Sequence, residues 1–188
     1  MRMDNTQLNK AIDRNLAELN NAILKRRALI GMHAAKSAHS LDFFTIVADA
    51  LFNDIVAHAI LVLDRSAQSA SFWYVHRAEK VRIENYAAAR SVSLDKLVDL
   101  ASRFKRIRDK THFHIDRNAV LQPSIVWSEA AVTGDELGWA LQTTHELLAD
   151  LKAELTGTRP MLPEYDGSDA AEIIRAYKKQ CPNAKLVV

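Results

Sequence analysis

Hydrophobic positions along the chain recur mainly at steps of three and four residues, which is the spacing of one helix face. In the first such segment, about residues 5–30, the apolar positions are Leu8, Ile12, Leu16, Leu19 and Ile23. A second seam, which alternates steps of four and three, runs from Leu137 to Leu155. Residues 41–64 are apolar nearly all round, which is typical of a helix in the centre of a bundle. The pattern therefore predicts a protein built from long helices.

Capping signals predict where further helices begin and end. A helix of less regular period is expected over residues 72–89, and Ser93 is the expected N-cap of a long amphipathic helix that continues into a basic segment. Its predicted buried stripe comprises Leu97, Leu100, Phe104 and Ile107.

The second half of the chain carries equally local signals. After Asn118 a loop marked by Pro123 is expected, and Thr133 with Glu136 three residues later forms a capping-box pattern. Gly157 is the natural end of the helix that follows. Ser168 is expected to cap a short last helix.

Composition agrees with this interpretation. The 188 residues are 48% hydrophobic and 26% charged, which suits one soluble domain, and five Gly with four Pro are too few for the turns of a β-sandwich. We predict an all-α, up-and-down bundle of four to five long helices with a short C-terminal helix. The bundle is expected over residues 1–157, and a linker and short helix packing on the same domain over residues 158–188.

The single cysteine and the N-terminus bear on location. Cys181 alone cannot form an internal disulfide or a zinc site of paired cysteines, so a cytoplasmic protein is expected. The first residues contain no apolar core of a secretory signal. The apolar run 43–63 is interrupted by Asp49, Asn53 and Asp54, which would be costly in lipid. We therefore interpret it as a buried core helix, and we expect no membrane association.

Charge is concentrated in one segment. Residues 103–117 carry six Lys or Arg against two Asp, a local excess of +4 in a chain whose net charge is +2, so the other residues sum to −2. A dense basic patch is the electrostatic footprint of a polyanion site, although a solvated helix face gives the same count.

The same segment gathers residues suited to phosphodiester chemistry. Arginine is always charged and binds phosphate with forked donors, and histidine exchanges protons near neutral pH. Together they suffice to cleave RNA without metal, as a base for the 2′-hydroxyl, an acid for the leaving oxygen and a cation for the phosphorane. His112, His114 and Asp116 also contain metal-ligand types, but H-x-H does not place both rings on one helix face, so neither a metal nor a cofactor is expected.

The string IRDKTHFHID, residues 107–116, resembles the R-x(4–6)-H signature of the HEPN superfamily, helical bundles many of which are metal-independent endoribonucleases. It is most similar to the abortive-infection branch, whose motif reads roughly R-D-K-x-x-A-H-x-D. The positions that match are Arg108, Asp109, Lys110, His114 and Asp116. Phe113 replaces the small residue before the histidine, and His112 is an additional histidine.

The resemblance implies a toxin or phage-defence endoribonuclease. It implies that Arg108 holds transition-state charge, Asp109 orients that arginine, His114 transfers protons and His112 is auxiliary. The RNA-binding residues expected from the basic segment are Arg103, Lys105, Arg106, Lys110 and Arg117. The expected partners are RNA, a second copy of the chain and a protein antitoxin, and no DNA.

Helix geometry bears on how such a site would assemble. On an unbroken helix Arg108 and His112 share a face, whereas His114 is rotated by roughly 120° from Arg108. Either the helix distorts between them or a second subunit completes the site. The resemblance to HEPN enzymes implies the second arrangement, in which two chains share one site, and therefore a twofold homodimer.

The sequence leaves two other functions open. One is a catalytically silent HEPN module that binds RNA or a nucleotide, or serves as a dimeric interaction protein. The other is a helical regulator unrelated to HEPN, which would follow if ordinary salt bridges occupied the motif.

Overall fold

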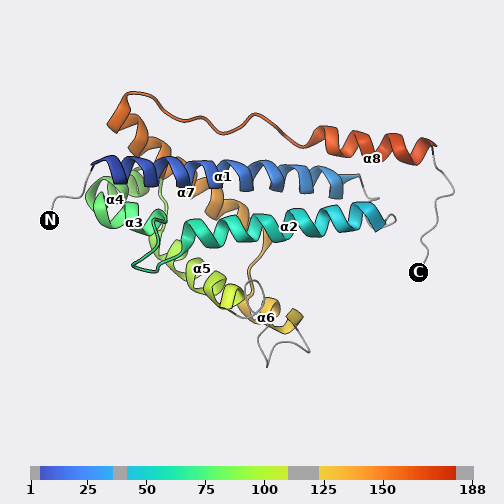
Figure 1. The fold of residues 1–188 in the computed structure, drawn as a ribbon, viewed down its shortest axis with the longest axis horizontal. Coiled ribbons are helices and arrows are strands. Elements are labelled where there is room, and N and C mark those ends of the chain that lie inside the picture. The colour runs from blue at the N-terminus through green and yellow to red at the C-terminus, as the bar shows by residue number, and fades with distance from the viewer. Residues whose placement is uncertain (1–4, 36–41, 110–122, 181–188) are drawn as a thin grey trace.

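The computed structural model describes residues 5–35, 42–109 and 123–180 (Figure 1). These residues form α1 (Asn5–Ala34), α2 (Asp42–Leu63), α3 (Phe72–Ala78), α4 (Lys80–Ala89), α5 (Leu94–Ile107), α6 (Pro123–Ala130), α7 (Gly134–Thr156) and α8 (Ser168–Gln180). The described residues contain no strand, and the predicted all-α bundle is confirmed.

The bundle is organised around α1. This helix lies against α2, α7 and α8, and α5 packs against α2, α6 and α7. Figure 1 shows α1 and α2 side by side and antiparallel. The apolar seam predicted for α1 is buried throughout, as is the predicted stripe of α5. In α7 the seam is buried from Leu137 to Leu151, and Leu155 in the last turn is exposed.

The predicted helix ends are confirmed where local side chains set them. The hydroxyl of Ser93 accepts a hydrogen bond from the backbone N–H of Lys96 at the start of α5. Thr133 and Glu136 form the reciprocal capping box of α7, and Gly157 ends that helix with a left-handed φ of 76°. These caps satisfy backbone groups that the helix leaves unpaired, so they depend on nearby sequence alone.

Two predicted segments differ from the structure. The single helix expected over residues 72–89 is broken at Glu79, whose backbone (φ −120°, ψ 39°) leaves the helical region between α3 and α4. The loop expected around Pro123 contains the short helix α6, which begins at that proline. A proline at the first helical position loses no hydrogen bond there and has the φ that a helix needs.

The prediction that α2 is a buried core helix is wrong for much of its length. From Ile55 onward one face of α2 is buried against the bundle, but Phe43 and Ile46 are 68% and 66% exposed. Residues 43–63 also form the one helix in the described part of the chain that is long and apolar enough to cross a membrane. The apolar residues of α2 therefore lie partly in the core and partly on the surface.

A polar cluster joins α1 to α2 inside this packing. Glu18 of α1 is buried and pairs with Nδ1 of His58 of α2. The Nε2 atom of His58 lies 3.0 Å from the ammonium of Lys25, which also pairs with Asp54. The buried carboxylate of Glu18 also pairs with the guanidinium of Arg14, so its charge has an opposite partner, as the cost of burying charge requires.

The segment 158–167 is held against α1 by backbone contacts. The guanidinium of Arg27 donates to the carbonyl of Tyr165 at 2.8 Å and to that of Pro163. A Cβ atom on Gly31 would overlap the carbonyl oxygen of Gly167, so the helix and the segment touch where neither has a side chain. This close approach leads into α8, which lies along α1 (Figure 1).

We expect Gly31→Ala to destabilise the protein by about 1–2 kcal/mol. Overpacking against fixed backbone costs ~1–3 kcal/mol, and the better helix propensity of alanine returns up to ~1 kcal/mol. Urea unfolding measures the change, and limited proteolysis should cut first within residues 158–167. Gly134→Ala is the matched control, because nothing lies within 4 Å of the position that the added methyl group would take and α7 begins there. Equal stability of the two variants would contradict the close contact.

Candidate functional site

The described part of the basic segment lies at the C-terminal end of α5. Arg103, Lys105 and Arg106 belong to the last turns of that helix, and Arg108 and Asp109 follow it in a π-helical turn. The other predicted site residues, His112, His114, Lys110 and Arg117, lie outside the described residues. A π-helical turn changes the rotation per residue and is frequent at functional sites. The helix is thus distorted where the motif begins.

Two carboxylates orient the side chain of Arg108. Its Nε atom donates to Asp109 at 2.8 Å, and its Nη1 atom lies 3.4 Å from Oδ1 of Asp64, at the end of α2. Asp109 also accepts from the ammonium of Lys105 at 2.5 Å. Asp109 therefore holds both Arg108 and Lys105 at the end of α5.

These contacts fix the charge state of the site. The hydrogen bond to Asp109, followed by the charges of Asp109 and Asp64, raises the pKa of Arg108 above its ordinary value. The hydrogen bond from Lys105, followed by that from Arg108, lowers the pKa of Asp109. Arg108 is therefore a permanent cation held beside an ionised carboxylate, and part of its charge remains available because the side chain is 27% exposed.

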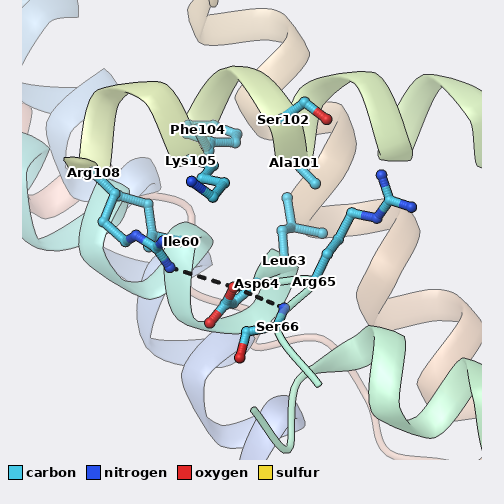
Figure 2. A pocket seen from close by; sticks show the side chains of 10 residues that line it. All are labelled: Ile60, Leu63, Asp64, Arg65, Ser66, Ala101, Ser102, Phe104, Lys105 and Arg108. Carbon is cyan, nitrogen blue, oxygen red and sulfur yellow. Dashed lines mark hydrogen bonds and ion pairs between the residues drawn. The ribbon is translucent and has the colours of Figure 1, made fainter. Parts of the chain in front are cut away.

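A cavity of about 270 Å³ lies between the end of α2 and α5 (Figure 2). Its floor is apolar and its rim is polar, and the lining residues are Ile60, Leu63, Asp64, Arg65, Ser66, Ala101, Ser102, Phe104, Lys105 and Arg108. In Figure 2, Arg108 and Arg65 stand at opposite ends of the cavity, and Lys105 points into it from α5. An apolar lining with a few polar side chains is the usual arrangement of a small-ligand pocket, and the charged side chains here are three cations and Asp64.

The sequence did not single out Asp64 or Arg65. They follow the apolar run of α2 as an ordinary charged pair, and no spacing links them to the motif 44 residues later. The turn that carries them is locally fixed, since Asp64 accepts the backbone N–H of Ser66 at 3.1 Å and Ser71 donates to the Asp64 carbonyl. Arg65 also lies 5.7 Å from the centre of the Trp73 ring. Only the packing of α2 on α5 brings these residues to Arg108.

Arg103 serves the junction of α5, α6 and α7. It donates to Glu136 at 2.8 Å and to the carbonyl of Ala131 at 2.8 Å, and it pairs with Asp99 at 2.9 Å. The hydrogen bond from Arg103, followed by one from the Thr133 backbone, lowers the pKa of Glu136 to about 2. Two carboxylates engage this side chain, as they do that of Arg108, but Arg103 does not line the cavity.

Arg106 pairs with Glu129 of α6, and both side chains are about half exposed. Together with Arg103 and Glu136 this pair shows that acidic residues distant in sequence oppose the basic segment. The local excess of +4 therefore overstates the field at this surface. Lys105, Arg108 and Arg65 are the cations that line the cavity.

Among the described residues no group of three or more His, Cys, Asp or Glu side chains could hold a metal ion. No protein family model, curated protein or solved structure matches the chain.

Proposed function

We propose that this chain is a metal-independent endoribonuclease of the HEPN type, acting in the cytoplasm as a toxin or phage-defence effector. The observation that carries the proposal is the position of Arg108. Two carboxylates orient this motif arginine at the edge of a cavity with Lys105 and Arg65 on its rim. The cavity is slightly smaller than the ~300–1,000 Å³ of pockets for drug-sized ligands, which suits a single nucleotide.

The proposed reaction is transfer of a phosphodiester to the neighbouring 2′-oxygen. The 2′-oxygen forms a bond to phosphorus, the bond from phosphorus to the 5′-oxygen breaks, and a 2′,3′-cyclic phosphate remains. One histidine takes the proton of the 2′-hydroxyl, and a second protonates the leaving 5′-oxygen. We assign proton transfer to His114, with His112 as an auxiliary, and charge stabilisation to Arg108.

Two copies of the chain would complete this site. The reaction needs a base and an acid, and each chain brings one compact motif. In a twofold dimer each chain supplies one Arg108 and one His114 to a shared cleft. The protein antitoxin expected for such a toxin would act by covering this cleft.

The test is incubation of the purified protein with a mixed-sequence RNA in EDTA. We expect cleavage products that end in 2′,3′-cyclic phosphate, and no cleavage of DNA of the same sequence, which lacks the 2′-hydroxyl. RNA affinity should fall as salt rises, because cation contacts with phosphate release counterions.

Phe113 and the additional His112 favour the alternative of a silent module that binds RNA or a nucleotide. The ion pairs of Arg103, Arg106 and Arg108 favour instead the helical regulator unrelated to HEPN, which was expected if salt bridges occupied the motif. The silent module would show salt-dependent binding of RNA or mononucleotide without any cleavage, with or without divalent metal. Absence of both binding and cleavage would contradict both functions and leave a helical protein of unrelated function.

A further inference from the structure

One cation of the cavity between α2 and α5 has no step assigned to it in the proposed reaction. Arg65 lines this cavity at the end opposite Arg108, just after α2 (Figure 2). Its side chain is exposed, and its guanidinium carbon lies 5.7 Å from the centre of the Trp73 ring. A guanidinium is attracted to the face of an aromatic ring, so this contact restricts the positions that the side chain can take. Arg65 is therefore an accessible cation with a preferred place at the rim.

The charges around the cavity are unequal in number. Lys105 and Arg108 share the carboxylate of Asp109. Arg108 also pairs with Asp64. Three cations thus stand against two carboxylates, and Arg65 is the cation that forms no ion pair within the described residues. A guanidinium without an internal carboxylate keeps its forked donors for an anionic ligand, and phosphate is an anion whose geometry they match.

The turn that carries Arg65 is ordered by local hydrogen bonds. Asp64 accepts the backbone N–H of Ser66 at 3.1 Å, and the hydroxyl of Ser66 accepts that of Gln68 at 3.2 Å. At the other end of the turn the hydroxyl of Ser71 donates to the carbonyl of Asp64. Side chains that bond to nearby backbone in this way fix a turn. The Arg65 side chain thus starts from a defined backbone position.

The length of the cavity suits one nucleotide. Along α5 its lining runs from Ala101 to Arg108, seven residue steps, which is roughly 10 Å at 1.5 Å per residue. Arg65 lies at the Ala101 end of this stretch, and Arg108 forms the other end (Figure 2). Apolar side chains, Leu63 and Phe104 among them, line the space between the two guanidinium groups. A base or ribose can rest there while one phosphate lies at each end.

We propose that Arg65 binds the phosphate next to the scissile one in an RNA strand, so that the cavity holds the nucleotide between these two phosphates. The inference rests on the proposed function, because it takes Arg108 to hold the scissile phosphate. The phosphate at Arg65 does not react, so its contact is the same in the ground state and in the transition state. Such a contact improves affinity and leaves the chemical step unchanged. Arg65 is thus a substrate-binding residue.

The test uses a DNA oligonucleotide that contains a single ribonucleotide, because only the linkage beside a 2′-hydroxyl can be cut by the proposed reaction. The bases at the ribonucleotide and its 3′ neighbour are randomised, so that a base preference does not hide the effect. In two further oligonucleotides a neutral methylphosphonate replaces the phosphate immediately 5′ or immediately 3′ of the scissile one. We expect one of these replacements to raise the KM of the wild-type protein at least about tenfold, because a charge-assisted hydrogen bond is lost.

Substitution of Arg65 shows whether this loss depends on its guanidinium. Arg65→Ala should raise the KM of the unmodified oligonucleotide by the same factor, with kcat retained and no further effect of the methylphosphonate. Arg65→Lys should keep part of the sensitivity, since an ammonium still binds phosphate as a point charge. The matched control is Arg77→Ala on α3, an exposed arginine that does not line the cavity and should behave as the wild type. Circular dichroism checks that each variant is folded.

The possible outcomes separate this phosphate site from the proposed function. If the oligonucleotide is cut but neither replacement matters, or if the sensitivity survives Arg65→Ala, the phosphate site is wrong and the ribonuclease stands. If Arg65→Ala lowers kcat with an unchanged KM, Arg65 acts on the scissile phosphate and the proposal is again wrong. If nothing is cut, the proposed function fails, and fluorescence anisotropy of the same oligonucleotides decides. A loss of affinity with methylphosphonate that disappears in Arg65→Ala supports the site, and equal affinities overturn it.

Discussion

Arg108→Ala is expected to lower the rate of RNA cleavage about 10²–10³-fold, the usual effect of removing one donor that stabilises transition-state charge. The RNA dissociation constant should change little, because the oriented guanidinium serves mainly the phosphorane. Arg108→Lys should recover only part of the rate, since an ammonium cannot keep the hydrogen bond from Nε to Asp109 while it also faces the cavity. Single-turnover kinetics with saturating protein separates the rate from the affinity.

Arg106→Ala is the matched control, because it removes a guanidinium of the same helix that pairs with Glu129 and does not line the cavity. This variant should weaken RNA binding more than the rate, since a peripheral cation acts on ground state and transition state alike. If Arg106→Ala and Arg108→Ala lowered the rate equally with unchanged affinity, the special position of Arg108 would be refuted.

Substitution of the two histidines shows which of them transfers protons. His114→Ala should cost about 10²–10⁴ in rate, the span of general acid–base catalysis, with RNA affinity retained. His112→Ala should cost less. The reverse order would mean that the pair of Arg108 and His112, four residues apart on one helix face, is the site and that the HEPN alignment is misplaced.

The helices that sequence predicted best are those whose signals are local. The capping box at Thr133 and the stop at Gly157 act within four residues. The apolar seam of α7 also predicted correctly which side of that helix is buried. The case of α2 differs, because an apolar residue raises the hydropathy of its segment equally whether its side chain is buried or exposed. Only the neighbours of α2 show that Phe43 and Ile46 are exposed, so its burial was mispredicted.

The candidate site was predictable only in its motif. Arg108 and Asp109 are neighbours in the chain, so their ion pair could be expected from the sequence. Asp64 and Arg65 reach the site through helix packing, which no local pattern records. The charge count failed for the same reason, since Glu129 and Glu136, which oppose Arg106 and Arg103, lie outside the counted segment.

The last expected result concerns stability against acid. His145 of α7 is fully buried, and neither ring nitrogen has a hydrogen-bond partner among the described residues. Burial lowers the pKa of His145 below 6.5, although the charge of Glu146 acts in the opposite direction. The native state therefore binds fewer protons than the unfolded chain once the pH falls below 6.5, and the protein loses up to about 1.4 kcal/mol per pH unit there.

His145→Leu, a change of similar volume, should remove this loss. The variant should be more stable than wild type by about 1–3 kcal/mol at pH 7.5, because it eliminates buried polar atoms without partners. The difference should widen by up to about 2 kcal/mol at pH 5, as protonation of the unfolded wild type sets in. Urea unfolding at the two pH values measures both quantities.

Two features keep this experiment specific. The carboxylates with lowered pKa, such as Asp150 and Glu136, titrate below this window and contribute equally to both proteins. Burial also lowers the pKa of His76, so the variant should retain part of the acid sensitivity of the wild type, and His76 must stay unchanged in the comparison. A stability difference that is the same at pH 7.5 and pH 5 would contradict this, because it would show that His145 has the same pKa in the native and the unfolded state.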